Sequence, residues 1–332
     1  MSLGEPVKIY PSMTPMRHGA DLFLASLLLL APCGARPGDR SVVPGLMGYN
    51  ALPSLPNADP KVEDHFRFEL AMAAQLSDLS RARDASVTPY LGLMAPFFGF
   101  AALELDAIPV EFWRVSPETQ RRLGATRGRG TAPGDLRFGA RFTLLDEREL
   151  LPAMGIRFVT KTTTGKSFED KRFTDAPAYV LDALFGKTLP VNLGPFQHVR
   201  VLAKVGFTAW QQGSNWQDDA VDLGATLRLR SARGTLFDLE WRGYWGYERF
   251  DRPSLVGVTL GHPVARALDL VGTINRGVTS DAPPWELRLG MIVHFDIGTA
   301  ARSRSPRDFP GKDGTAADTG EKGGEKSTDT KG

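Results

Sequence analysis

The stretch Thr164–Ser167, which reads Thr-Gly-Lys-Ser, has the composition of the last part of a phosphate-binding loop. Such a loop needs an earlier glycine, a buried strand before it and a helix after it, so that backbone N–H groups can surround the phosphates. The position five before Gly165 is Thr160, and Arg157 and Lys161 lie where a buried parallel strand would be apolar. We therefore interpret the stretch as a strand that ends in a polar loop.

The sequence gives little support for other kinds of catalytic site. A nucleophilic serine needs an adjacent base, and no Gly-x-Ser-x-Gly elbow occurs. The single cysteine, Cys33, excludes a thiolate metal site. His65 and His294 could share a metal where the first and last strands meet, but no third ligand is evident, so a polar seam is favoured. We expect no enzyme activity, no cofactor and no metal.

Charged residues recur at every second position in several segments, which places them on one face of each segment. Asp182 and Arg276 are assigned to this inward face as well. Its candidate lumen or substrate contacts are Glu104, Asp106, Arg137, Arg141, Arg157, Lys161, Arg200, Lys204, Arg228, Asp238, Glu240 and Arg242.

Two interpretations of this charged face remain open. Acids and bases fall on neighbouring segments, with Glu104 and Asp106 beside two arginines and Asp182 beside Arg200 and Lys204. The favoured interpretation is that these pairs neutralise one another and stiffen a wall, because unpaired charges away from bulk water are costly. In the alternative, the basic side chains attract an anionic solute, as charged rows can tune selectivity in pores.

The segments that carry these charges alternate between apolar and polar residues, which is the period of a β-strand with two different faces. Glycine (35 residues) and proline (24 residues) mark many turns and favour an all-β chain. The expected strands are 65–77, 85–95, 98–109, 135–146, 153–162, 177–186, 198–210, 219–231, 235–246, 253–261, 266–276 and 285–297. We predict a single antiparallel transmembrane β-barrel of about twelve strands.

A soluble β-sandwich would also alternate, with its apolar face turned inward, and three features favour the barrel over it. The longest connections fall on one side if the first strand starts in the periplasm. Aromatic residues such as Trp241, Trp285 and Phe295 lie near strand ends. The N-terminal residues also read as an export signal, so we expect the chain to be exported.

The predicted organisation has four parts. Residues 1–35 read as a secretory signal peptide, with an apolar run over 22–31, and lipidation at Cys33 is a minor alternative. Residues 36–64 are rich in proline and form either a plug in the lumen or a periplasmic segment. Residues 65–297 form the barrel. Residues 298–332 contain almost nothing apolar and are expected to be a disordered tail.

The hairpin around Gly234 predicts a specific register. A three-residue loop over 232–234 places glycine where a left-handed residue is needed. That loop length sets Arg228 opposite Asp238 and keeps the polar rows of both strands on one face.

The segment that begins at Gly134-Asp135 and continues past Lys161, Thr164 and Gly165 resembles a family of transporter-like outer-membrane proteins named after the meta-cleavage pathway of phenol degradation. In that family a Gly-Asp strand precedes a strand ending in a Lys-x-x-Thr-Gly loop. The resemblance covers roughly residues 134–190. It implies an outer-membrane barrel that passes small, often hydrophobic compounds.

Two functions follow from these features. The first is an outer-membrane channel or transporter for small solutes, hydrophobic or anionic. The alternative is a non-conducting structural or assembly barrel that binds envelope partners, for example in polysaccharide export. The expected partners are the lipid bilayer of the outer membrane, the barrel-assembly machinery and a small solute. A net charge of +2 gives no reason to expect nucleic acid.

Overall fold

The computed structural model describes residues 55–77, 84–170, 172, 177–211, 217–246, 252–279 and 282–295. The predicted signal peptide, the lipidation alternative at Cys33, most of the proline-rich segment and the predicted C-terminal tail lie outside these residues.

Within the described residues, fourteen strands form one antiparallel sheet, accompanied by two short helices. The strands are β1 (Phe66–Leu76), β2 (Ala85–Phe97), β3 (Ala101–Ala107), β4 (Glu111–Arg114), β5 (Arg129–Ala132), β6 (Leu136–Leu145), β7 (Ala153–Lys161), β8 (Ala178–Leu189), β9 (Phe196–Gln211), β10 (Gln217–Ser231), β11 (Leu236–Gly246), β12 (Ser254–Ala265), β13 (Leu268–Gly277) and β14 (Trp285–Phe295). The helices are α2 (Pro117–Leu123) and the 3-10 turn η1 (Phe168–Asp170).

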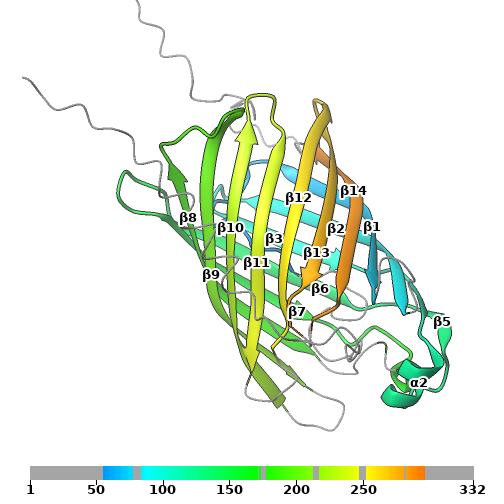
Figure 1. Cartoon of the computed structure of the whole chain (residues 1–332). Coiled ribbons are helices and arrows are strands. Elements are labelled where there is room, and N and C mark those ends of the chain that lie inside the picture. The colour runs from blue at the N-terminus through cyan, green and yellow to red at the C-terminus, as the bar shows by residue number, and fades with distance from the viewer. Residues whose placement is uncertain are drawn as a thin grey trace, which may run out of the picture. The chain divides into compact units, whose positions relative to one another are not determined.

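The sheet closes on itself because β1 pairs with β2 on one side and with β14 on the other. Strands β4 and β5 form a hairpin that joins only the start of β2, so the closed cylinder among the described strands has twelve members. Figure 1 shows the strands wrapping around one axis, with α2 and β5 beyond their ends. The predicted twelve-stranded antiparallel barrel is confirmed.

The connection between β3 and β6 differs from the plain loop that the sequence predicted over 110–134. It contains the β4–β5 hairpin and α2. The helix begins because the Ser116 side chain accepts a hydrogen bond from the backbone N–H of Thr119, and it ends at Gly124, whose φ of 64° is left-handed. Neither α2 nor any other helix in the described ranges is long and apolar enough to cross a bilayer.

Each barrel strand has an apolar outer face and a largely polar inner face. On β1, Leu70 and Met72 are 43% and 50% exposed, whereas Glu69 and Ala71, which alternate with them, are buried. The exposed large apolar residues recur around the outer surface, including Phe158, Leu181 and Phe207 on three adjacent strands. An apolar exterior over a polar interior suits a barrel surrounded by lipid.

The hairpin of β10 and β11 has the predicted register. Arg228 lies opposite Asp238, and Ser231 donates its backbone N–H to the carbonyl of Thr235 at 2.9 Å. The three-residue loop between these ends contains Gly234 with a φ of 82°, a conformation that side chains rarely adopt. The hairpin prediction is confirmed.

The two ends of the barrel differ in the length of their connections. At the turn end the strands are joined by residues 98–100, 146–152, 190–195, 232–235 and 266–267. At the loop end they are joined by residues 77–84, 108–135, 162–177, 212–216, 247–253 and 278–284. Both of the longest connections are at the loop end. Short periplasmic turns and longer outer loops are typical of outer-membrane barrels, so we expect the turn end to face the periplasm.

Replacing Leu181 by arginine should destabilise the barrel in a bilayer, by up to about 2–4 kcal/mol, because a cation on the lipid face must be desolvated. Leu181 is 54% exposed on the outer face of β8, and its neighbours across the sheet are Phe158 and Phe207. Denaturant titration of folding into phospholipid vesicles measures this free energy. The control is Leu150→Arg in the 146–152 turn, where the leucine is 93% exposed; an equal loss in both variants would contradict a lipid-facing Leu181.

Candidate functional site

The chain enters β1 through a segment that lies inside the barrel, and we call residues 55–64 the luminal segment. Leu55 at its start is 2% exposed and packs against inward side chains of β7 and β8, including Val159 and Val180. The Arg157 guanidinium donates a hydrogen bond to the carbonyl of Pro56 at 3.1 Å. The luminal segment therefore fills part of the space that the wall encloses.

Asn57 fixes the luminal segment to β10 and β11. Its backbone N–H donates to a carboxylate oxygen of Glu240 at 3.0 Å. Its side-chain Nδ2 lies within hydrogen-bond distance of three oxygens, namely Ala225 O at 3.1 Å, Thr226 Oγ1 at 3.0 Å and Trp241 O at 3.0 Å. A Cβ atom at Gly224 would lie 2.0 Å from the Asn57 Oδ1. The absence of a side chain at Gly224 thus makes room for this asparagine.

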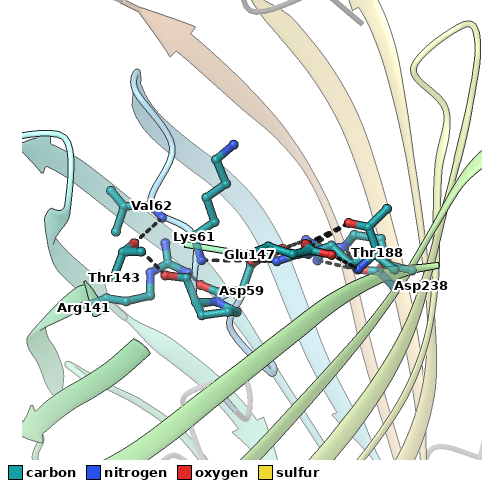
Figure 2. Close-up of polar contacts among 11 residues, drawn as sticks. Asp59, Lys61, Val62, Arg141, Thr143, Glu147, Thr188 and Asp238 are labelled. Atoms are coloured by element: carbon teal, nitrogen blue, oxygen red, sulfur yellow. Dashed lines mark hydrogen bonds and ion pairs between the residues drawn. The ribbon is translucent and has the colours of Figure 1, made fainter. Parts of the chain in front are cut away.

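Asp59 joins the luminal segment to two cations of the wall. Arg200 donates to both carboxylate oxygens, at 2.8 and 3.0 Å, and Arg228 lies 3.6 Å away. Burial alone would raise the pKa of Asp59, but the hydrogen bond and charge of Arg200 outweigh it and hold the pKa below its usual value. In Figure 2, Asp59 lies between Arg141 on one side and Asp238 on the other. Asp59 is therefore ionised at neutral pH and held in place by Arg200.

The predicted charges on β3, β6 and β7 meet in pairs. Glu104 accepts from Arg157 at 2.7 Å and lies 3.3 Å from Arg141, so one carboxylate bridges two guanidinium groups. Asp106 lies 3.3 Å from Arg137, its direct neighbour across the sheet. These strongly buried contacts match the pairing that the sequence favoured for this part of the wall.

Lys161 belongs to a different arrangement, at the loop end. Its Nζ lies 2.7 Å from one oxygen of Asp135, and the other oxygen of Asp135 accepts the backbone N–H of Gly165 at 2.7 Å. Thr164 donates to the carbonyl of Gly134 at 3.3 Å. The motif residues around Thr164–Ser167 therefore tie the loop after β7 to the start of β6, and they form no phosphate cradle.

The cluster around Lys204 is only partly as predicted. Lys204 contacts Asp222 at 2.5 Å and Asp182 at 3.6 Å, and all three side chains are nearly inaccessible. Arg200 does not join Asp182, although the sequence predicted that pairing. It is held by Asp59 and by Glu147 instead, because the luminal segment and the 146–152 turn bring these carboxylates to its end of β9.

The remaining candidates lie on β10 and β11. The Arg228 guanidinium makes a two-pronged contact with Asp238, with N–O distances of 2.8 and 3.0 Å. Arg242 contacts Glu240 on its own strand and lies 3.3 Å from Glu286 on β14. All twelve candidate residues thus lie on the inner face, whereas Arg276, also assigned there, lies over Trp285 on the outer row at 4.5 Å from its ring centre.

A cavity of about 230 Å³ lies between the luminal segment and the wall. Its lining includes Glu63 and Lys61 of the luminal segment, together with Arg67, Arg230 and Asp269 of the surrounding strands. Eight carboxylates and seven lysine or arginine side chains line it in all, so its walls are highly polar but nearly balanced in charge.

The residues of the luminal segment could not be assigned from sequence patterns. Asn57 and Asp59 lie in a proline-rich stretch without a strand period, so no pattern gave them a face. The available signal was their chemistry: an asparagine and an aspartate in a segment next to a barrel whose inner face carries many arginines.

Removing both partners of the Arg228–Asp238 pair should cost less than the sum of the two single replacements. We expect a coupling energy above about 1 kcal/mol, the upper end for surface ion pairs, since the two side chains are only 24% and 10% exposed. A double-mutant cycle with Arg228→Ala and Asp238→Ala measures it. The exposed pair of Arg127 and Glu169, 4.0 Å apart, is the control and should show no coupling; equal behaviour of the two pairs would mean that water reaches Arg228 freely.

Comparisons with known proteins agree with this architecture. No model of a known protein family matches the sequence, and no curated protein is significantly similar to it. Among solved structures, the COG4313 outer membrane channel from Pseudomonas putida F1 superposes with a TM-score of 0.54 at 16% identity, over 73% of this chain and 100% of that chain. The KdgM porin (TM-score 0.43, 9% identity, 69% and 99% covered) and the anion-selective porin from Comamonas acidovorans (0.31, 9%, 70% and 98%) are looser matches. The first of these three likenesses supports a shared barrel fold.

Proposed function

We propose that this protein is a bacterial outer-membrane channel for small solutes. The observation that carries the proposal is the closed barrel with an apolar exterior and a charged interior that still contains a cavity of about 230 Å³. A wall without free strand edges can span a bilayer, and its polar interior can hold water. The structure with a TM-score of 0.54 is itself described as an outer membrane channel.

The charge arrangement bears on which solutes pass. The arginines at 141, 157, 200 and 228 each contact at least one carboxylate. The cavity lining carries both signs in nearly equal number. Such a wall offers no strong excess of positive charge, so we propose small solutes with little or no net charge in preference to anions.

The luminal segment sets the width of the proposed pathway. It contacts β6, β7, β9, β10 and β11 through hydrogen bonds of Pro56, Asn57, Asp59 and Pro60. Solutes larger than water therefore require this segment to shift or to leave part of the lumen. We propose that the segment limits conductance in the resting barrel.

We also propose that the chain belongs to the family named after phenol degradation and that the barrel-assembly machinery inserts it. Membership of the family named after phenol degradation is supported by the motif around Asp135 and Lys161 and by the barrel itself. Insertion by the barrel-assembly machinery is supported by Phe295, an aromatic residue at the end of the last strand that stacks on Phe66 with ring centres 5.5 Å apart.

Loosening the luminal segment should raise single-channel conductance. The double variant Asn57→Ala, Asp59→Ala removes the side-chain hydrogen bonds of Asn57 to β10 and β11 and the ion pair of Asp59 with Arg200, but keeps the backbone hydrogen bond from residue 57 to Glu240. Planar bilayer recordings should show larger steps than the wild type. The matched control is Asp64→Ala, which replaces a carboxylate just before β1 and should leave the steps unchanged. Equal steps in all three proteins would mean that the segment does not restrict the pathway.

The channel should discriminate weakly between cations and anions, because positive and negative groups line the cavity in similar number. In a salt gradient across the bilayer, the reversal potential should lie close to zero. A reversal potential near the equilibrium potential of the anion would instead favour the alternative in which basic side chains attract an anionic solute.

One observation favours the alternative of a non-conducting barrel. The luminal segment is held by many buried polar contacts, including those of Asn57. Bilayers that stay silent with the wild type and with the loosened variant would support a structural or assembly role. Silent wild-type bilayers and clear steps from the variant would support a closed channel.

A further inference from the structure

Three potential metal ligands lie together at the turn end of the barrel. They are Glu63 of the luminal segment, His65 just before β1, and His294 near the end of β14. One ligand atom of each lies within 4.8 Å of the others. None of the three is among the twelve candidate lumen residues, although Glu63 and His294 also line the cavity.

The distances fit ligands of one ion. His65 Nε2 lies 3.4 Å from an oxygen of Glu63, and the two imidazole ring centres are 4.8 Å apart. Two ligands that share a tetrahedral zinc at about 2.0–2.1 Å lie about 3.4 Å from each other. The wider separations, up to 4.8 Å, would have to close by up to about 1.4 Å, which side-chain rotation at half-buried positions allows.

A fourth residue orients one of the histidines. His294 Nε2 lies 3.0 Å from a carboxylate oxygen of Asp269 on the neighbouring strand β13. If Nε2 carries the proton and donates it to Asp269, Nδ1 is left with its lone pair. That Nδ1 atom is buried and makes no hydrogen bond within the described structure. A metal-bound histidine usually has such a carboxylate on its other nitrogen.

We propose that Glu63, His65 and His294 form a binding site for a divalent transition metal ion, with Zn²⁺ as the best fit. Two imidazoles and one carboxylate are a donor set that Zn²⁺ accepts, and they leave a fourth position for water. Two nitrogen ligands disfavour Mg²⁺ and Ca²⁺, which prefer oxygen. The nearby cation Arg67 is engaged by Glu69 at 3.2 Å.

The ion would join two parts of the fold that are far apart in the chain. Glu63 belongs to the luminal segment, whereas His65 and His294 flank the seam at which β1 and β14 close the barrel. Bound metal would therefore fix the luminal segment to the wall at the turn end of the barrel. The consequence that metal would lower conductance rests on the proposed channel function, but the metal site itself does not.

Zinc titration of the purified barrel tests the site directly. The full chain, folded in detergent, freed of metal with a chelator and carrying no polyhistidine tag, is titrated with Zn²⁺ by calorimetry. We expect one ion per chain. Single variants His65→Ala, His294→Ala and Glu63→Gln should each weaken binding by about tenfold or more, and Asp269→Asn should weaken it about 10–100-fold through loss of the orienting contact.

Matched controls distinguish this site from other histidines. His262 lies on β12 and contacts the Thr235 hydroxyl at 3.0 Å, so His262→Ala should bind Zn²⁺ as the wild type does. The difference in gel mobility between heated and unheated samples shows whether each variant is folded. If folded wild type binds no Zn²⁺, or if folded His294→Ala binds it with wild-type affinity, the proposal is overturned. Neither outcome depends on conductance, so channel function is tested separately.

Discussion

The structure depends on one constraint: the backbone hydrogen bonds of a sheet in lipid must all be made within the protein. An open sheet would leave the N–H and carbonyl groups of its edge strands without partners, at several kilocalories per mole for each group. Pairing of β1 with both β2 and β14 removes those edges. Closure also divides every strand into a face toward lipid and a face toward the lumen, because side chains alternate along a strand.

Charge pairing inside the lumen follows from that division. The inner face carries many acids and bases within a confined space, where an unpaired charge is expensive. Oppositely charged residues therefore lie directly across from each other on neighbouring strands, such as Asp106 opposite Arg137 and Arg228 opposite Asp238. The wall is consequently polar without a strong net charge, and that property shapes the proposed preference for solutes.

The luminal segment uses the same chemistry over long distances in the chain. Asn57 reaches the carbonyl of Trp241, 184 residues later, and Asp59 reaches Arg200, 141 residues later. These contacts can form only after the wall has brought β9, β10 and β11 together. Replacing few side chains can therefore weaken the contacts of the segment with the wall.

The sequence by itself determined those features of this protein that depend on local spacing. Period-two alternation predicted the twelve barrel strands, their inner and outer faces, and the inward position of all twelve candidate residues. The glycine at position 234 and the matching rows around it determined the β10–β11 register, because a two-residue loop would have turned one row outward. Only the tertiary structure decided which charges meet across distant segments. Arg200 contacts Asp59 and Glu147 instead of Asp182, and Glu63 lies beside His65 and His294, since closure and the path of the luminal segment bring these groups together. Residues 55–64 have no strand period, so no local pattern records where they pack.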